Sequence, residues 1–268
     1  MTSPWIALLL ACFIWWFSTG AILMVVKRAD RAGGDAHLWS VLWGLLVLIA
    51  GGVGFWASLQ MTSVAGAYLA FVSALAVWGW IELAFLSGKI MGPIQTPCPE
   101  DVPEWERFLR AWSTIAYHEA ALLAALILMI FVSQGAGNQF GLWTYAVLFF
   151  ARISAQLNLF FGVPKINTEF LPKPLAHLPS HFKIARLNWL FPISITALSF
   201  AVACWLERLF AVSTDWQIVG FALLSAITAL ALLEHWLMVL PLPDEKLWRW
   251  MLPKPDNNTK TMKTRTVQ

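Results

Sequence analysis

The amino-acid sequence predicts an all-α, polytopic membrane protein with seven transmembrane helices. Of its 268 residues, 59% are hydrophobic and 12% are charged, whereas soluble proteins are about 45–50% apolar and about 25% charged. Apolar runs of about 20 residues recur along the chain, and each can cross a hydrocarbon core about 30 Å thick at about 1.5 Å per residue. These two observations argue against a soluble single domain.

The apolar runs follow one another in order, separated by polar or proline-rich stretches. No basic region precedes the first run, and Lys27 and Arg28 follow it, so we expect a retained helix rather than a signal peptide. Tryptophans stand near the ends of the runs, as they do at the two interfaces of a membrane. The predicted transmembrane helices cover residues 5–26, 38–58, 63–87, 111–133, 141–161, 188–210 and 216–240.

The basic residues predict the orientation of these helices. Apart from Arg152 and Arg208, every Lys and Arg lies after the first, third or fifth run, or in the C-terminal tail. Because loops rich in Lys and Arg stay in the cytoplasm, we expect the N-terminus outside and the C-terminus in the cytoplasm. A net charge of +3 spread over these loops does not favour binding to nucleic acid.

The domain organisation predicted from these patterns is simple. Residues 1–252 form a single seven-helix transmembrane domain, with two proline-rich cytoplasmic loops, 88–110 and 162–187, that we expect to be ordered. Residues 253–268 are polar and basic and are expected to be a disordered cytoplasmic tail near anionic lipid. The three cysteines are far apart, which does not favour a disulfide framework or a clustered-cysteine metal site.

A small set of polar residues interrupts the apolar runs and forms the candidate site. Each charged residue inside a bilayer costs at least about 2.5–3.5 kcal/mol, so it needs a partner or a function. At the helical rise, most of these residues lie roughly 8–12 Å beneath the cytoplasmic surface, with Arg152 deeper. The candidate pigment or metal pocket comprises Glu82, His118, Glu119, Arg152, Asn158, Glu234 and His235.

This polar layer has three interpretations from sequence alone. The carboxylates pair with Arg152 and simply join helices; or Glu and His hold a divalent metal such as iron, manganese or zinc, or the magnesium of a tetrapyrrole; or the layer conducts protons. No Glu-x-x-His pair is present, and neighbours such as His118 and Glu119 point about 100° apart on a helix. The metal interpretation is therefore not specific.

The second cytoplasmic loop and two aromatic runs add further candidates. Asn167, Glu169 and His177 are expected in the cytoplasmic cap above the polar layer; His181 follows His177 at helical spacing, but Pro179 between them makes a regular helix doubtful. The runs Trp15-Trp16-Phe17 and Trp78-Gly79-Trp80 lie well inside helices. They either face lipid or form a stacking surface for a porphyrin or quinone.

Four segments carry a resemblance to a known family: Trp15-Trp16-Phe17-Ser18-Thr19-Gly20, Tyr117-His118-Glu119, the stretch 157–172 (LNLFFGVPKINTEFLP) and the stretch 234–244 (EHWLMVLPLPD). From the first helix to about Trp250 the chain resembles the PuhE family, the photosynthetic complex assembly proteins of purple phototrophic bacteria.

The resemblance implies an integral membrane assembly factor for the photosynthetic reaction centre and light-harvesting complexes, linked to bacteriochlorophyll production and resident in the bacterial inner, cytoplasmic or intracytoplasmic, membrane. The implied partners are membrane lipid and either subunits of those complexes or enzymes of pigment synthesis. No catalytic residues come with the family, so non-enzymatic assistance is favoured, with bacteriochlorophyll, one of its precursors or a divalent metal as the expected ligand. The alternative is a membrane metalloenzyme with a carboxylate and histidine iron site that acts on a tetrapyrrole or quinone; a transporter is a third option.

Overall fold

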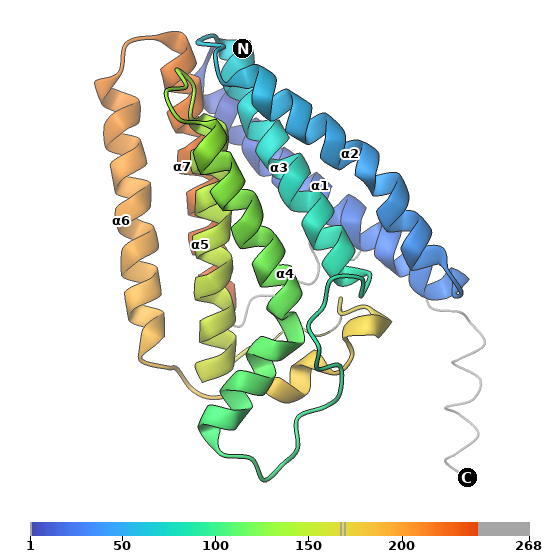
Figure 1. Ribbon diagram of the computed structural model, residues 1–268. Coiled ribbons are helices and arrows are strands. Elements are labelled where there is room, and N and C mark those ends of the chain that lie inside the picture. Colours follow the sequence, from blue (N-terminus) through green and yellow to red (C-terminus); the bar gives the residue numbers. More distant parts are fainter. Residues whose placement is uncertain (1, 167, 169, 241–268) are drawn as a thin grey trace, which may run out of the picture.

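Seven long helices make up most of the chain in the computed structural model, which describes residues 2–166, 168 and 170–240. All seven are long and apolar enough to cross a membrane, which confirms the predicted class. No strand occurs among the described residues, where a single bridge joins Val163 to Ile184. The helices are α1 (Pro4–Ala32), α2 (Ala36–Ser58), α3 (Val64–Leu86), α4 (Glu104–Val132), α5 (Phe140–Phe161), α6 (Leu190–Ala211) and α7 (Asp215–Leu237) (Figure 1).

Two helices extend beyond the apolar runs. α1 continues to Ala32, and α4 begins at Glu104, so the prediction of a loop over 88–110 is wrong for its last seven residues. Acidic side chains in the first turn suit the positive end of a helix, and Glu104–Arg107 and Glu106–Arg110 pair at 2.9 and 2.7 Å. These i,i+3 and i,i+4 pairs support helix outside the apolar run. The predicted tail, 253–268, lies outside the described residues.

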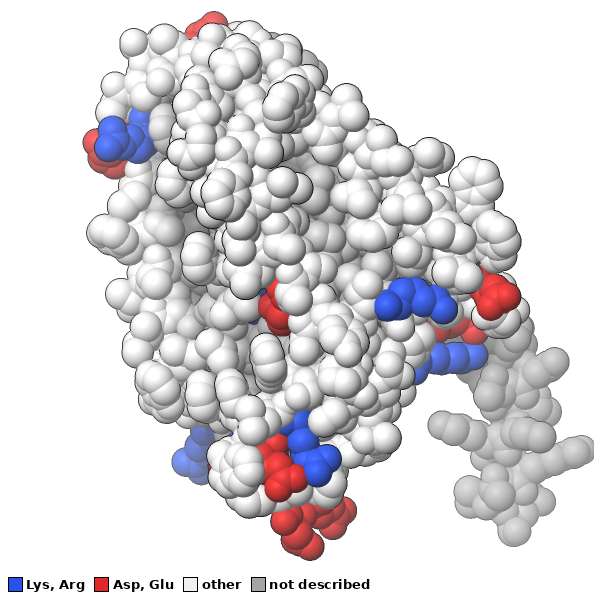
Figure 2. Space-filling model, in the orientation of Figure 1, with Lys and Arg blue, Asp and Glu red and all other residues white. Residues whose placement is uncertain are grey.

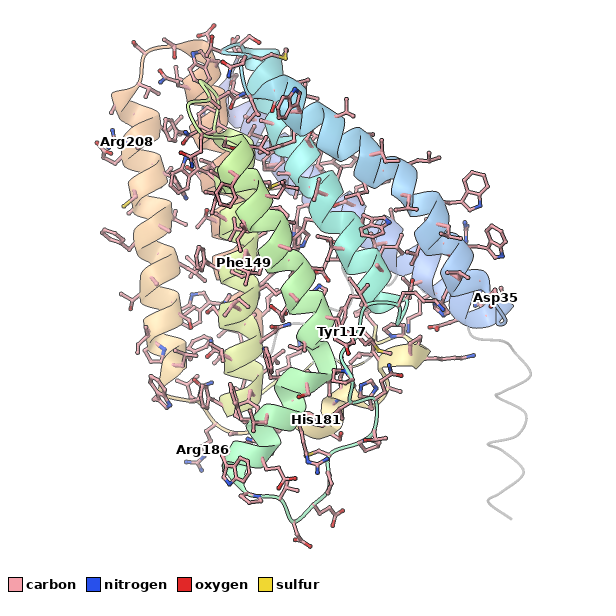
Figure 3. All side chains as sticks on the ribbon, in the orientation of Figure 1. Asp35, Tyr117, Phe149, His181, Arg186 and Arg208 are labelled. Carbon is pink, nitrogen blue, oxygen red and sulfur yellow. The ribbon has the colours of Figure 1, made fainter. Side chains whose placement is uncertain are left out.

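The helices form a bundle with α3, α5 and α7 at its centre. α1 packs against α7 and α3, α2 lies on α3, α6 lies on α7, and α4 contacts α5; in Figure 1, α2 and α6 stand at opposite edges. The α1–α2, α3–α4 and α5–α6 connections all lie toward the lower end, with Asp35 and Arg186 on opposite sides of the bundle in Figure 3, whereas Arg208 lies near the upper end. Charged side chains gather toward the ends and leave a mostly uncharged band between them (Figure 2).

The upper half of the bundle, toward the α2–α3, α4–α5 and α6–α7 connections, is closely packed. Its core combines small residues with aromatic rings, including Ala67, Phe71, Phe140 and Leu223. Gly220 lies directly against the Phe140 ring, where a Cβ atom would overlap the ring atoms. Small residues of this kind let membrane helices approach closely, so the upper halves of α3, α5 and α7 hold the bundle together.

The segment 162–187, called the cap below for its described residues, closes the lower end. It contains two short 3-10 helices, η1 (Lys173–Leu175) and η2 (Leu178–His181), and its Leu175 and Leu178 are buried against Phe85 and Met91. Several bonds fasten it to the helices: Lys27 Nζ donates to the Leu171 carbonyl at 2.9 Å, Lys173 Nζ to the Asp30 carbonyl at 2.8 Å, and Arg107 Nη1 to the His181 carbonyl at 3.2 Å. These contacts hold the described part of the cap against α1, α3 and α4.

Candidate functional site

The lower half of the bundle encloses a cavity of about 1250 Å³. Its volume exceeds the roughly 300–1,000 Å³ of most small-molecule pockets. The lining comes from α1, α3, α4, α5, α7 and the cap, and is mainly aliphatic and aromatic. Trp15 and Trp78 both contribute to it, so one tryptophan from each aromatic run lines the cavity, while Phe17 is 51% exposed.

A charged cluster from three helices lies at the cavity wall. Arg152 on α5 pairs with Glu82 on α3 through Nη1 and Oε1 at 3.0 Å, and its Nε lies 3.8 Å from Oε1 of Glu119 on α4. All three side chains line the cavity. The guanidinium thus joins two carboxylates that would otherwise repel each other in a medium of low dielectric constant.

His118 on α4 contacts both carboxylates of the cluster but does not line the cavity. Its ring is fully buried, with Nε2 3.5 Å from Glu82 Oε1 and Nδ1 3.4 Å from Glu119 Oε1. The Phe85 ring stacks on the imidazole with centroids 4.2 Å apart, and the Arg152 guanidinium carbon lies 5.3 Å from the same ring centre. One phenyl ring therefore contacts both the imidazole and the guanidinium of the cluster, and His118 lies between the two carboxylates without lining the cavity.

Glu234 on α7 faces the same cavity but takes no part in the cluster. Its side chain lines the cavity and is exposed there, and it makes no ion pair or hydrogen bond with any other residue that the structure describes. Three helices other than α5 hence contribute carboxylates to one space, as the sequence predicts, but only two of these carboxylates are paired with Arg152.

The remaining two residues of the candidate pocket, His235 and Asn158, point elsewhere. His235 is 1% exposed; its Nε2 lies 2.9 Å from Ser154 Oγ and its Nδ1 lies 2.8 Å from the Ala231 carbonyl. Asn158 Nδ2 donates to Ser194 Oγ at 2.9 Å. These bonds join α5 to α7 and α6. Neither residue lines the cavity. Adjacent side chains on a helix point about 100° apart, and the preceding residues, Glu234 and Leu157, are the ones that line it.

The cap residues predicted from sequence are not brought to the cavity where the structure describes them. His177 and His181 are buried, with ring centres 6.5 Å apart, and His181 Nε2 lies 3.2 Å from the Thr96 carbonyl. Burial lowers the pKa of both imidazoles. Neither ring is part of the cavity lining. Asn167 and Glu169 lie outside the described residues.

Several lining residues are not among the candidate site residues predicted from the sequence. Gln156, one turn below Arg152, and Phe85, which supports the cluster, both line the cavity, and the cap adds Phe170, Leu171, Leu175, Leu178 and Phe182. The cap residues do carry a signal, since apolar side chains recur every three or four positions between prolines. Phe85 carries none, because an aromatic residue in an apolar run is equally compatible with lipid contact.

The donor atoms of the site suit some ligands better than others. Among the described residues, no group of three or more His, Cys, Asp and Glu side chains is placed to hold a metal ion, because Arg152 takes the position between the two carboxylates. The site instead offers a large apolar space with a guanidinium and, on Glu234, a carboxylate that has no partner among the described residues. This arrangement suits an amphipathic organic molecule better than a bare cation.

Fold and site together define a polytopic α-helical membrane protein with an aromatic, partly charged cavity in one half of its bundle. The chain belongs to the family DUF3623, described as proteins of unknown function, whose model matches residues 1–259. It is 56% identical over 262 residues to a Rhodobacter capsulatus protein described as "Uncharacterized 30.4 kDa protein in puhA 5'region", a match that covers 98% of this chain and 96% of that protein. No solved structure matches the chain.

Proposed function

We propose that the protein is an assembly factor of the photosynthetic apparatus, the PuhE-type function, and that its cavity holds bacteriochlorophyll or a precursor during assembly. The Rhodobacter capsulatus relative is described as a protein of the puhA 5' region, which suggests a link to genes of photosynthesis. The resemblance of the four sequence segments to the PuhE family supports the same function. On this proposal the membrane is the bacterial inner membrane.

The observation that carries the proposal is the cavity of about 1250 Å³ in the lower half of the bundle. A large planar pigment needs apolar walls, aromatic rings for stacking and very few polar groups. Trp15 and Trp78 supply the rings, and Glu82, Glu119, Arg152 and Glu234 supply the charged groups. The residues present thus fit a tetrapyrrole.

The chain's own residues would handle such a ligand by binding and shielding it. Glu82, Glu119 or Glu234 would supply a carboxylate oxygen to the pigment's magnesium, and Arg152 would donate to a carbonyl or carboxylate at the pigment's edge. A bound bacteriochlorophyll would supply light absorption and a Lewis-acidic magnesium. The cap excludes water from the lower end of the cavity through Leu171, Leu175 and Leu178.

Affinity purification from phototrophically grown membranes, with mass spectrometry and an absorption spectrum of the same sample, tests the proposal. We expect subunits of the reaction centre or light-harvesting complexes, or enzymes of pigment synthesis, together with a pigment band. A colourless, stably folded product without any of these partners would contradict the proposal.

The alternative function, a membrane metalloenzyme acting on a tetrapyrrole or quinone, is favoured by one contact. His118 bridges Glu82 and Glu119 at 3.5 and 3.4 Å, so carboxylate and imidazole atoms do meet. Single Glu82→Gln and Glu119→Gln variants separate the two functions when pigment intermediates are followed. Accumulation of one defined precursor would favour the enzyme, whereas a graded loss of assembled complexes with unchanged intermediates would favour the assembly factor.

A further inference from the structure

The cavity reaches the lipid-facing surface of the bundle between α4 and α5. Trp112 and Leu123 on α4 both line it, yet they are 54% and 45% exposed. Between them the lining residues of α4 include two alanines, Ala116 and Ala120, which leave space that larger side chains would fill. Figure 3 shows Tyr117 and Phe149, which also line the cavity, at mid-height of the bundle and away from both ends.

The same space continues past α5 into the interior of the bundle, as far as α7. On α5, Phe149 and Ile153 line it on one stripe of the helix, and Leu148 and Ala155 line it on the neighbouring stripe. Beyond α5 the lining includes Ile227 and Ala231 of α7, which are only 1% and 5% exposed. One continuous cavity therefore joins an open lipid-facing gap to a deeply buried wall.

Charge is distributed unevenly along this route. Figure 2 shows a small, mostly acidic patch amid uncharged surface at the middle of the face where α4 and α5 lie. The lining holds the three carboxylates of Glu82, Glu119 and Glu234 against the two cations Arg152 and Lys165. Because Arg152 is already shared by Glu82 and Glu119, Glu234 is the carboxylate left to meet a ligand.

We infer that the cavity takes up an amphipathic molecule directly from the bilayer through the gap between α4 and α5, and that Glu234 binds the molecule's positively charged or hydrogen-bond-donating group. A carboxylate without an intramolecular partner in an apolar cavity is unfavourable until a complementary group arrives. A ligand with such a group gains this attraction in addition to burial of its apolar part. The inference rests on the proposed function only in that both require a lipid-soluble ligand in this cavity.

A pair of alanine substitutions on α4 tests the route of entry. Ala120 lines the gap, whereas Ala124, one turn further along, is exposed but does not line it. Purified protein in phosphatidylcholine vesicles is mixed with vesicles that carry a pyrene-labelled long-chain ammonium, and energy transfer from tryptophan reports its uptake. We expect Ala120→Trp to slow saturable uptake at least tenfold and Ala124→Trp to leave it unchanged. Equal rates for both variants and the wild type would overturn the route.

The binding partner of the ligand is tested by Glu234→Gln, with Glu207→Gln on the exposed surface of α6 as the matched control. We expect Glu234→Gln to weaken saturable binding of the ammonium probe at least tenfold at an unchanged melting temperature, since Glu234 has no described partner to lose. The pyrene-labelled carboxylate of the same chain length should bind at least tenfold more weakly than the ammonium to the wild type. Equal binding of both probes, or no effect of Glu234→Gln, would overturn the role of Glu234.

The outcome can be separated from that of the proposed function. Saturable, Glu234-dependent binding of the ammonium probe, with neither pigment nor photosynthetic subunits in the purified sample, would retain this inference and remove the proposed function. Pigment and photosynthetic subunits in the sample, with binding independent of Glu234, would retain the proposed function and overturn this inference.

Discussion

The upper and lower halves of the bundle are built from the same helices but differ in packing. On α7, the residues from Val219 to Thr228 are almost all buried against neighbouring helices, whereas Ala231 and Glu234 below them face the cavity. α3 changes in the same way, from the buried Ala67, Ala70 and Phe71 to the cavity-lining Trp78 and Glu82. Close packing in one half thus coexists with open space in the other.

This difference shows why the charged cluster can persist in a membrane. Transmembrane helices associate through van der Waals packing and interhelical hydrogen bonds rather than through the hydrophobic effect. The upper half provides that packing with small residues such as Gly220 and Gly141, so the lower half is free to carry unfavourable charges. We therefore expect substitutions to have different consequences in the two halves.

The largest effect is expected from Arg152→Leu, because Arg152 is the cation that joins Glu82 and Glu119. Its removal leaves two carboxylates facing each other, and loss of one partner of a buried ion pair costs about 3–5 kcal/mol. The side chain of Arg152 is 23% exposed, so we expect a loss near the lower end of this range. Thermal melting in mild detergent measures the change.

Two further variants control for this effect. Arg152→Lys keeps a charge and should recover part of the stability, and Glu82→Gln combined with Glu119→Gln should recover most of it in the Arg152→Leu background, since no like charges remain to repel. A melting temperature of Arg152→Leu equal to that of the wild type would show that the cluster does not stabilise the lower half.

A smaller effect is expected from adding bulk to the upper half. Gly220→Val places side-chain atoms inside the space of the buried Phe140 ring, and overpacking of this kind costs about 1–3 kcal/mol. In the lower half, a Cβ atom on Gly79 would meet only Ile22 Cδ1 at 3.4 Å, an ordinary contact, so Gly79→Ala should be neutral. If both variants melt at the same temperature, the packing of the two halves does not differ as described.

The fold could be predicted from sequence because a segment that crosses a bilayer must satisfy its own backbone hydrogen bonds, and a helix of about 20 apolar residues does so. Each of the seven apolar runs is a helix, with ends within a few residues of the prediction except at Ala32 and Glu104. α4 extends because charged side chains, such as Glu106 and Arg110, form local pairs that stabilise helix beyond the apolar run. Hydropathy identifies only apolar runs, so it does not predict helix that is stabilised by charged pairs outside them.

The candidate site could be predicted only in part. Hydropathy identifies Glu82, Glu119, Arg152 and Glu234 as exceptions within apolar runs, and the structure places all four at one cavity. The direction in which His235 and Asn158 point depends on helix rotation, which one sequence with little amphipathic pattern does not fix. The sequence left open which carboxylate pairs with Arg152 for the same reason; within the described part of the chain, Glu82 and Glu119 do so and Glu234 does not.

Acidification should loosen the cap before it affects the upper half. Burial holds the pKa of His177 and His181 below the ordinary value of 6.5, so the unfolded segment binds protons more readily than the folded one. The stability contributed by the neutral rings is therefore complete above about pH 6.5 and falls as pH drops below that value. Arg107 and Arg110 act on His181 in the same direction, which disfavours a charged ring further.

Hydrogen exchange of residues 171–182 at several pH values measures this loosening. We expect exchange to rise a few-fold between pH 7 and pH 5, after correction for intrinsic rates, while α7 in the upper half stays protected. His177→Phe combined with His181→Phe should abolish the pH dependence. A pH-independent cap in the wild type would contradict the role of these rings.

The smallest effect is expected at the extramembrane start of α4, where Arg110 pairs with Glu106. Both side chains are about one-third exposed, at 33% and 31%, and an i,i+4 pair of this kind contributes about 0.3–0.5 kcal/mol. Arg110→Ala should therefore lower the melting temperature by only about 1–2 °C. Arg107→Ala, which also removes donors to the Phe160 and His181 carbonyls, should lower it more. A reversed order would mean that the start of α4 is stabilised by its own surface pairs rather than by its contacts with α5 and the cap, and the lower half would then depend less on the cap than its bonds indicate.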